Sequence, residues 1–382
     1  MAIKSLKIQN IRNLLHIDFA PSAQVNLIHG ANGSGKTSLL EAINFLGLTR
    51  SFRTRKFPYF VTRDQSESLV FAQLQRTEGQ AQTIEALGVS RDLSGSVSIR
   101  HSGSNIDISQ LASLVPLLVI NTDTFQILEG SPAVRRQFVD WGSFHSDQSY
   151  IQAWRSFKRV LQQRNSLLKC GKIDPQIRRV WDAEFVRYAQ QITEIRQQYI
   201  NQLLPDFLAI SERLMGEADL SLSFSPGWDQ KRALDELLEE QLPRDLRQGF
   251  TSAGPQRADL RIKIQGISAS ERLSRGQKKL VVSALKLAQG VVYNRHKEDR
   301  CIYLIDDLPS ELDAQHCQLF CQFLEQTNSQ CFITCVEPQT LMSYWQSETT
   351  VKRIAMDNGQ LVTNSTGECA ENKLKVGEIK EI

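Results

Sequence analysis

Hydrophobic and polar residues alternate along residues 3–20 in two short runs that meet near Arg12. Alternation with a period of two predicts a β-hairpin. A short apolar run at 25–28 predicts a further strand, and the amphipathic stretch 38–47, which ends at a glycine, predicts a helix. Residues 69–108 carry short apolar runs between turns that contain Gly, Ser and Asp, so the N-terminal third is predicted to be rich in strands.

The period of the pattern changes at about residue 131. Residues 131–242 carry apolar positions at helical spacing, for example Trp154, Phe157 and Leu161, and contain few strand-like runs. After Gly249 strands and helices alternate again. The predicted strands are 260–265, 301–305 and 331–334, and the predicted helices are 276–294 and 313–326. A helical segment is therefore predicted between two regions that contain strands.

Composition is typical of a globular protein, with 382 residues of which 41% are hydrophobic and 23% charged. This length predicts two or three domains, or one large domain with an insertion. The longest apolar run, 111–120, has ten residues and is broken by Pro116, whereas a membrane-spanning helix needs about 20. The first 19 residues lack the pattern of an export signal, so we expect a cytoplasmic protein.

The net charge of the chain is only +3, but two of its segments are strongly basic. Residues 1–63 hold nine Lys/Arg and two Asp/Glu, and residues 134–200 hold twelve and six. Such blocks in a nearly neutral chain predict a local anionic partner. For the second block, a solvated helical face is an equally good explanation.

Five of the seven cysteines lie between Cys301 and Cys335. Cys317 and Cys321 fall on a predicted helix, and Cys331 and Cys335 fall on a predicted strand. Zinc-binding cysteine pairs are typically spaced C-x₂₋₄-C on turns, which this arrangement does not match. We therefore expect free buried thiols and no disulfide framework.

Residues 30–37 match the phosphate-binding pattern G-x₄-G-K-[ST] and lie between a predicted strand and a predicted helix. Glycines let backbone N–H groups curl around phosphates, and the positive end of the helix dipole adds to the attraction. In such a loop Lys36 reaches the β and γ phosphate oxygens, and the Thr37 hydroxyl binds Mg²⁺. The predicted phosphate ligands are Gly30, Ala31, Asn32, Gly33, Ser34, Gly35, Lys36 and Thr37.

A second candidate site follows the apolar run 301–305, which ends in Asp306 and Asp307. The run suits a strand that is buried on both faces. Two adjacent carboxylates at the tip of such a strand are costly unless a cation or a charged ligand neutralises them. We predict that Asp306 binds Mg²⁺ and that Asp307 polarises an attacking water, with an acidic surface turn as the alternative.

A third motif, LSRGQKK at 273–279, directly precedes a predicted helix. Ser274 and Gly276 at the start of that helix would offer a hydroxyl and backbone amides to another phosphate. Taken alone, the motif is better explained by Ser274 as an ordinary N-cap.

Together the three motifs are far more specific than any one of them. The order GxNGxGKT, LSRGQ, and then an apolar strand with DD and SELD resembles the ABC-type ATPase heads of the SMC/RecF-type family. Other strings that carry the resemblance are IRNL at 11–14, RSFR at 50–53, VRRQFVD at 134–140, QRNSLLK at 163–169 and TSAGPQRADL at 251–260. The resemblance therefore covers most of residues 1–340.

This resemblance implies an α/β fold, a P-loop ABC-type ATPase head assembled from both chain ends with an inserted, mainly helical lobe. The implied domains are 1–130 for the N-terminal part of the head, 131–245 for the inserted lobe and 246–362 for the C-terminal part. Residues 363–382 would be a polar tail.

The resemblance also implies ATP and Mg²⁺ as cofactors, with the nucleotide held between two protomers. Lys36 and Thr37 of one chain would face Ser274, Gly276 and Gln277 of the other. ATP-driven dimerisation would be coupled to DNA binding and slow hydrolysis.

Lys36 and Asp307 would be the catalytic residues of a weak ATPase. The Asp307 carboxylate is one methylene shorter than the Glu of transporter ATPases, which suits a switch better than a motor. Members of the family help recombination mediators load recombinase at gapped DNA, so the proteins RecO and RecR are the implied partners.

The candidate DNA contacts are the basic residues around Phe52 and at the start of the helical segment, which are Arg50, Arg53, Arg55, Lys56, Arg135 and Arg136. Lys and Arg neutralise DNA phosphates and give sequence-independent, salt-sensitive binding. Pairing within the chain or between protomers is the alternative for each of them.

The resemblance therefore implies an ATP-dependent DNA-binding protein of replication and recombinational repair that responds to DNA damage. The alternative is the nucleotide-binding subunit of an ABC transporter, against which the helical insertion and the basic blocks count. A nuclease fused to such a head would need a further acidic cluster, which we do not find in the sequence.

Overall fold

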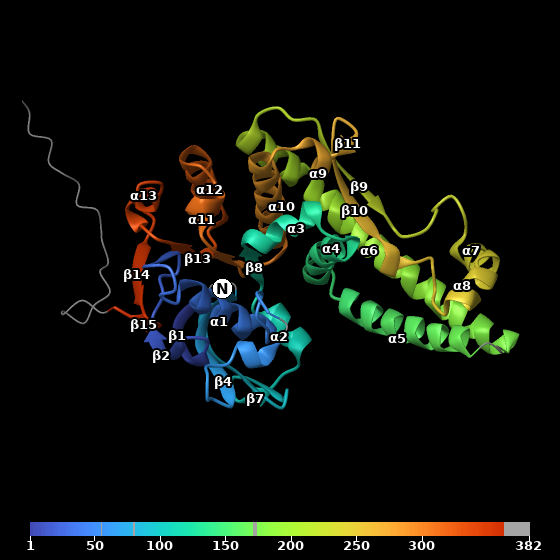
Figure 1. Cartoon of the computed structure of the whole chain (residues 1–382), viewed down its shortest axis with the longest axis horizontal. Helices are drawn as coiled ribbons and strands as arrows, with labels where there is room; N and C mark the ends of the chain where they lie inside the picture. The colour runs from blue at the N-terminus through green and yellow to red at the C-terminus, as the bar shows by residue number, and fades with distance from the viewer. Residues whose placement is uncertain (55, 79–80, 171–173, 363–382) are drawn as a thin grey trace, which may run out of the picture. The chain divides into compact units, whose positions relative to one another are not determined.

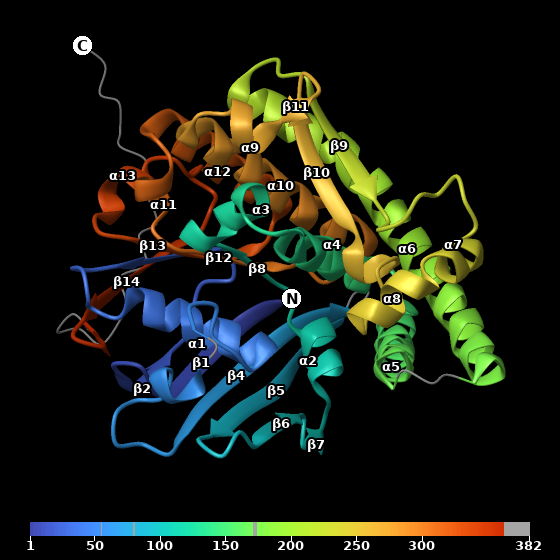
Figure 2. The ribbon, with the colours of Figure 1, turned by 45° about the vertical axis from the view of Figure 1, so that its right-hand side comes forward.

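The computed structural model describes residues 1–54, 56–78, 81–170 and 174–362, which form two compact units. The first unit is Met1–Thr124 with the described residues from Tyr293 onward, and the second is Phe125–Val292. Figures 1 and 2 show both units. The predicted domains 1–130, 131–245 and 246–362 rest on the change of hydrophobic pattern and on the family resemblance, and they stay a prediction. The predicted tail, 363–382, lies outside the described residues.

The first unit contains two six-stranded sheets. The antiparallel sheet has the order β2-β1-β4-β5-β6-β7. Its strands are β1 (Ala2–Ile11), β2 (Leu14–Phe19), β4 (Glu67–Glu78), β5 (Ala81–Asp92), β6 (Val97–His101) and β7 (Ser104–Asn105). The other sheet has the order β15-β14-β3-β13-β12-β8 and is parallel except for β15. Its strands are β3 (Val25–His29), β8 (Leu117–Ile120), β12 (Ile302–Ile305), β13 (Gln330–Cys335), β14 (Val351–Asp357) and β15 (Gln360–Leu361).

Helix α1 (Lys36–Leu48) lies between the two sheets of the first unit and contacts β4 and β13 (Figure 2). One apolar core takes in side chains of α1 and of both sheets, such as Ile8, Phe45 and Phe332. The other helical segments of this unit are α2 (Ile108–Leu114), α11 (Leu308–Glu311), α12 (Ala314–Thr327), α13 (Pro338–Met342), and the short turns η1 (Phe57–Tyr59) and η2 (Thr122–Phe125), the last of which ends at the unit boundary.

The parallel sheet places the candidate chemistry along one edge. Strands β3, β12 and β13 are almost wholly buried, as expected for a sheet covered on both faces. Because β13 pairs in parallel with both β3 and β12, the carboxyl ends of all three meet at the same edge. The phosphate loop after β3 and the aspartates after β12 therefore share that edge.

The second unit is mainly helical, with a small antiparallel sheet of order β11-β10-β9. Helices α5 and α6 run side by side as a long hairpin (Figure 1), and an apolar core that includes Phe157, Phe185 and Leu238 lies between them and α7. The elements are α3 (Gln126–Glu129), α4 (Pro132–Ser146), α5 (Tyr150–Lys169), α6 (Pro175–Met215), β9 (Leu220–Ser225), α7 (Leu234–Glu240), α8 (Leu242–Gln248), η3 (Pro255–Arg257), β10 (Asp259–Ile264), β11 (Ile267–Ser268), α9 (Ala269–Arg272) and α10 (Arg275–His296), whose last residues belong to the first unit.

Most elements predicted from the hydrophobic pattern are confirmed. The N-terminal hairpin, the strand before the phosphate loop and the helix after it occur within two residues of the predicted bounds. The pattern missed β8, β9 and β14. Strand β8 is only four residues long and follows Pro116, so it gave too short a run to be distinguished from a buried loop.

The five cysteines just before β12 and within α12 and β13 are free and buried, as predicted: Cys301, Cys317, Cys321, Cys331 and Cys335. Burial raises the pKa of the Cys317 and Cys335 thiols to about 11, so both stay protonated at neutral pH. Within the described residues, no cluster of His, Cys, Asp and Glu has metal-binding geometry, and none of the described helices is long and apolar enough to cross a bilayer.

Candidate nucleotide site and basic surfaces

The phosphate loop connects β3 to α1 and depends on glycine at positions with positive φ. Gly30, Gly33 and Gly35 have φ values of +149°, +83° and +110°. At Gly30 a Cβ atom would lie 2.2 Å from the Met356 carbonyl oxygen of β14, so a side chain does not fit. The Lys36 ammonium lies over the loop and donates to the carbonyl oxygens of Gly30 at 2.7 Å and Ala31 at 2.9 Å.

Two hairpin turns form hydrogen bonds to the phosphate loop and to the start of α1. The Asn13 side chain, in the turn between β1 and β2, donates to the Gly33 carbonyl at 3.4 Å and accepts from the Ser38 hydroxyl at 2.9 Å. The Gly359 N–H, in the turn between β14 and β15, donates to the Ser34 carbonyl at 2.8 Å. The loop is therefore held by segments from both ends of the chain, which the sequence did not reveal.

Thr37 and Asp306, predicted as metal ligands, are in direct contact. The Thr37 hydroxyl donates to Asp306 Oδ1 at 2.9 Å across 269 residues of sequence. Thr334 of β13, which sequence reasoning missed, also donates to Asp306 Oδ1, at 2.8 Å. A hydroxyl and a carboxylate oxygen at this spacing suit a hard cation such as Mg²⁺, which prefers oxygen ligands.

Asp307 adopts a backbone conformation that is unusual for a residue with a side chain. Its φ and ψ are 56° and 50°, in the left-handed region, and it directly precedes the short helix α11. Its N–H donates to the Thr334 hydroxyl at 2.7 Å. The Asp307 carboxylate, which we predict to polarise a water, therefore projects from a strained backbone that is held by a hydrogen bond to Thr334 of β13.

Two cations lie near the start of the loop. The pKa of His29, the last residue of β3, is lowered by partial burial and by the nearby charges of Arg353 and Lys36. His29 is therefore neutral at pH 7 and does not add to the positive charge. Lys36 and Arg353 are therefore the positive charges near His29, and Asp306 and Asp307 bring two negative charges to the same edge of the sheet.

The LSRGQ motif lies in the second unit and forms a capping box. The Ser274 N–H donates to Gln277 Oε1 at 3.0 Å, and the Gln277 N–H donates to the Ser274 hydroxyl at 3.3 Å. Ser274, Gly276 and Gln277 are all exposed, and a Cβ atom at Gly276 would meet no atom within 4 Å. The N-cap interpretation is therefore correct locally, and the surface around Gly276 is open.

The basic loop after α1, residues 50–56, is held by a buried carboxylate. Glu41 of α1 is fully buried and accepts from Arg12 through two bonds of 3.0 and 3.1 Å and from the Ser51 hydroxyl. The Arg53 guanidinium, half exposed, lies 3.7 Å from the same carboxylate. Of the predicted DNA contacts, Arg53 is therefore partly neutralised within the chain.

Like Arg53, the cations Arg50 and Lys56 of this loop are exposed. Among the described residues, neither is within ion-pair distance of a carboxylate, and Lys56 lies over the Tyr59 ring, 5.8 Å from its centroid. Arg55 lies outside the described residues.

Arg135 and Arg136 of α4, also predicted as DNA contacts, are both held within the second unit. Arg135 is largely buried and forms a bidentate pair with Asp259, with distances of 2.7 and 3.2 Å. Arg136 donates to the Ala258 carbonyl at 2.8 Å, and partial burial lowers its pKa. These two side chains connect α4 to the start of β10.

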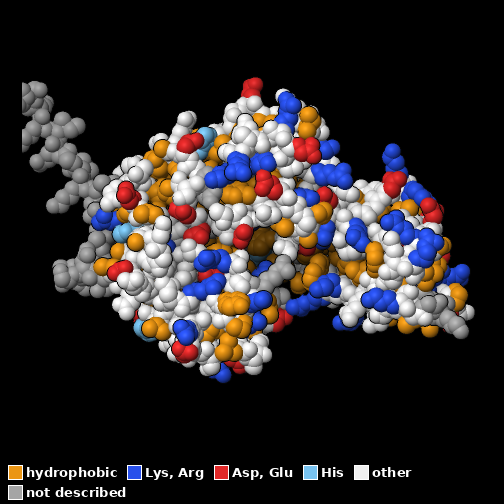
Figure 3. All heavy atoms as spheres, in the orientation of Figure 1, with side chains coloured by type: hydrophobic (Ala, Val, Ile, Leu, Met, Phe, Trp, Pro, Cys, Tyr) orange, Lys and Arg blue, Asp and Glu red, His pale blue; other side chains and the backbone are white. Residues whose placement is uncertain are grey.

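Part of the second basic block is likewise neutralised inside the helical unit. Arg164 of α5 is almost completely buried and pairs with Asp182 at 2.7 Å and Asp245 at 3.1 Å. Lys158 and Arg159, on the same helix, are exposed. Figure 3 shows Lys and Arg side chains gathered over the end of this unit where α5, α7 and α8 lie.

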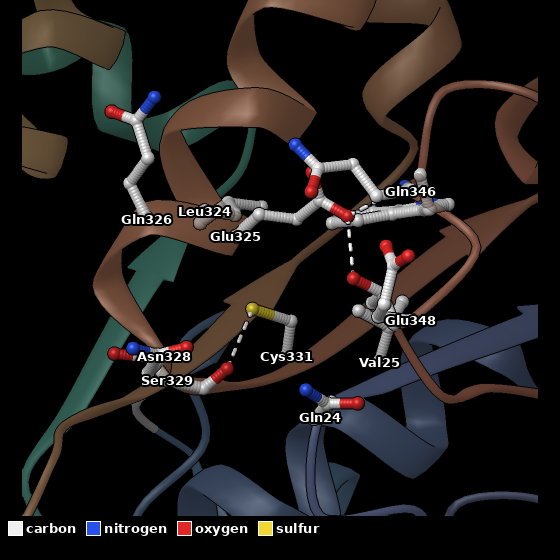
Figure 4. Close-up of a pocket in the computed structure, with 12 residues that line it drawn as sticks. Gln24, Val25, Leu324, Glu325, Gln326, Asn328, Ser329, Cys331, Gln346 and Glu348 are labelled. Atoms are coloured by element: carbon white, nitrogen blue, oxygen red, sulfur yellow. Dashed lines mark hydrogen bonds between the residues drawn. The ribbon is translucent and has the colours of Figure 1, made fainter.

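A separate cavity of about 350 Å³ lies at the other end of the parallel sheet, where β3 and β13 begin (Figure 4). Its lining includes Gln24, Glu325 and Gln346, and the Cys331 thiol there donates to the Ser329 carbonyl at 3.4 Å. The phosphate loop follows the opposite, carboxyl end of β3. The cavity is therefore not part of the nucleotide site.

Comparison with known proteins agrees with this architecture. Residues 2–361 match the family described as the RecF/RecN/SMC N terminal domain. The "DNA replication and repair protein RecF" of Pseudomonas aeruginosa (strain LESB58) is 44% identical over 367 residues, which is 96% of this chain and 99% of that protein. The protein of the same name from Pseudomonas putida (strain GB-1) is 44% identical over 362 residues, 94% of this chain and 98% of the relative.

Solved structures share the fold. A structure of the recombination mediator protein RecF with ATP, in the RecFOR pathway, has a TM-score of 0.82 and 22% identity, and the match covers 94% of this chain and 97% of that one. The Smc head domain of Pyrococcus furiosus has a TM-score of 0.57 and 16% identity, with 96% of both chains covered.

The two sheets, the glycine loop and the helical insertion define the fold of an ABC-type ATPase head of the SMC group. Within that group, the relatives that share 44% of their residues with this chain over nearly its whole length are RecF proteins. The chain belongs to the RecF family.

Proposed function

We propose that this chain is an ATP-dependent DNA-binding protein of replication and recombinational repair, in which slow ATP hydrolysis acts as a switch. Its relatives at 44% identity are named for DNA replication and repair, and the RecF structures that share its fold are described with ATP in the RecFOR pathway. Membership of the RecF family counts against the transporter subunit as the alternative.

The contact between Thr37 and Asp306 is the observation that carries the proposal. At 2.9 Å it joins the phosphate loop to the aspartate pair across 269 residues of sequence. These two side chains would hold Mg²⁺, which neutralises charge on the phosphates when bound. Lys36 would exchange its loop carbonyls for the β and γ phosphate oxygens, and Asp307 would accept a hydrogen bond from the attacking water.

The exposed capping box of the second unit supports pairing of two protomers. Ser274, Gly276 and Gln277 present a hydroxyl, an unobstructed backbone and a side-chain amide. In the proposed dimer these groups of one protomer contact the γ-phosphate held by Lys36 of its partner. Because ADP lacks the γ-phosphate, ATP and not ADP would stabilise this dimer.

The proposed DNA contacts are four exposed cations of the two basic blocks that lie outside any described ion pair: Arg50 and Lys56 in the first unit, and Lys158 and Arg159 in the second. They would bind phosphates of double-stranded or gapped DNA with little dependence on sequence. Arg53 would contribute less, because Glu41 already lies 3.7 Å from it. RecO and RecR are the proposed protein partners at the gap.

Light scattering of the purified chain tests the proposal. The mass should double with ATP and Mg²⁺ and stay that of a monomer with ADP or without nucleotide, and a gapped duplex should increase both the dimer fraction and the turnover. Lys36→Ala should remain monomeric with ATP, because it removes the charge that faces the phosphates. A wild-type chain that binds ATP but stays monomeric, with turnover indifferent to DNA, would refute the proposal.

A further inference from the structure

Thr334 lies at the centre of the candidate site, although no sequence motif points to it. It is the second-last residue of β13, and the residue is 1% exposed. Strand β13 lies between β3, which leads into the phosphate loop, and β12, which ends at the aspartates. Its carboxyl end therefore reaches the same edge as both motifs.

The Thr334 hydroxyl makes two hydrogen bonds whose directions are fixed. The Asp307 N–H can only donate, so at 2.7 Å the hydroxyl oxygen accepts from it. The hydroxyl therefore donates its own hydrogen bond to Asp306 Oδ1, 2.8 Å away. One side chain thus connects the backbone of one aspartate to the carboxylate of the other.

These bonds set the orientation of both carboxylates. Asp306 Oδ1 accepts two hydrogen bonds, from the hydroxyls of Thr37 and Thr334, and Oδ2 makes no hydrogen bond within the described part of the chain. The bond to the Asp307 N–H supports the left-handed backbone of that residue, from which its side chain projects. A change at Thr334 therefore alters both groups at once.

We propose that Thr334 is a positioning residue, which aims Asp306 at the bound Mg²⁺ and Asp307 at the attacking water. The inference rests on the proposed nucleotide function and adds to it a residue outside the phosphate loop and the aspartate pair. Thr334 acts through the two aspartates and does not touch the nucleotide.

The test compares Thr334→Val with Thr334→Ser. Valine keeps the shape and removes the hydroxyl, so the Mg²⁺ concentration needed for half-maximal binding of a fluorescent ATP analogue should rise by about tenfold or more, as expected for loss of a hydrogen bond to a charged group. Turnover at saturating Mg²⁺ should fall by at least as much. Affinity for the analogue in EDTA should not change, and serine should restore the Mg²⁺ dependence.

Thr327→Val is a matched control in the same unit. Thr327 of α12 is buried, and its hydroxyl donates to the Leu324 carbonyl at 2.7 Å. This variant should leave the Mg²⁺ dependence unchanged. Circular dichroism checks folding, and Thr334→Ala replaces the valine variant if that variant does not fold.

The outcomes separate the two proposals. Normal Mg²⁺ dependence and turnover in a folded Thr334→Val or Thr334→Ala variant overturns the role of Thr334 and leaves the nucleotide function intact. The same loss in Thr334→Ser as in Thr334→Val also overturns it, because the hydroxyl is then not the cause. Failure of the wild-type chain to bind the analogue at any Mg²⁺ concentration refutes the nucleotide function itself.

Discussion

The salt dependence of DNA binding should depend on the exposed cations of the basic loop and not on the paired ones. Replacing Arg50 and Lys56 together with glutamine removes two charges that lie outside any described ion pair. Each cation that neutralises a DNA phosphate adds about 0.9 to the slope of log K against log salt. The double variant should therefore have a slope shallower by about 1.8.

This change in slope is large enough to measure. Between about 50 and 200 mM salt, a slope difference of about 1.8 means that the wild-type chain loses about 12-fold more affinity than the double variant. Fluorescence anisotropy with a labelled gapped duplex, in ATP and Mg²⁺, gives the binding constant at each salt concentration.

Arg135→Gln is the matched control for this measurement. It also removes a cation, but the Arg135 guanidinium is largely buried and forms the bidentate pair with Asp259. Its slope should equal that of the wild-type chain. An unchanged slope in the Arg50/Lys56 variant, or an equal loss in Arg135→Gln, would show that exposure and pairing do not decide which residues bind DNA.

Three further predictions concern packing, electrostatics and assembly. Gly142→Ala should destabilise the helical unit by about 1–3 kcal/mol in urea unfolding, because the new Cβ would lie 1.8 Å from the Tyr199 ring; unchanged stability would contradict this packing. The His29 pKa, from NMR titration, should rise toward 6.5 in Lys36→Ala, because a nearby cation that lowers it is removed; a pKa that does not move would place Lys36 elsewhere. Ser274→Arg should block ATP-driven dimerisation in light scattering while the monomer still binds ATP, and a normal dimer would remove that surface from the interface.

The sequence could point to those parts of the candidate site that short segments determine. The phosphate loop is one continuous string, and its glycines, Lys36 and Thr37 have the local geometry that the motif requires. Asp306 could be predicted because a buried apolar strand ends in carboxylates that need a counter-charge. Both predictions depend on the order of residues within about ten positions.

Contacts between distant segments could not be predicted in this way. Thr334 is important because β13 lies between β3 and β12, and strand order is not encoded in any single run of residues. Arg135 met the criterion of a basic cluster, but its partner, Asp259, is 124 residues away. A charge count along the chain cannot separate a cation that is paired across the fold from one that faces solvent.

Helix α1 links the two proposed activities within the first unit. Its first residues, Lys36 and Thr37, belong to the phosphate loop, and its buried Glu41 accepts from Ser51 of the basic loop. Because a buried carboxylate is costly without its donors, a displacement of α1 carries Arg12 and the basic loop with it. Asn44 of the same helix also donates to the Arg50 carbonyl oxygen at 2.6 Å. If the basic loop binds DNA as proposed, a movement of this helix on nucleotide binding would reach the DNA contacts through Glu41 and Asn44, and Glu41 lies about one and a half helical turns after Lys36.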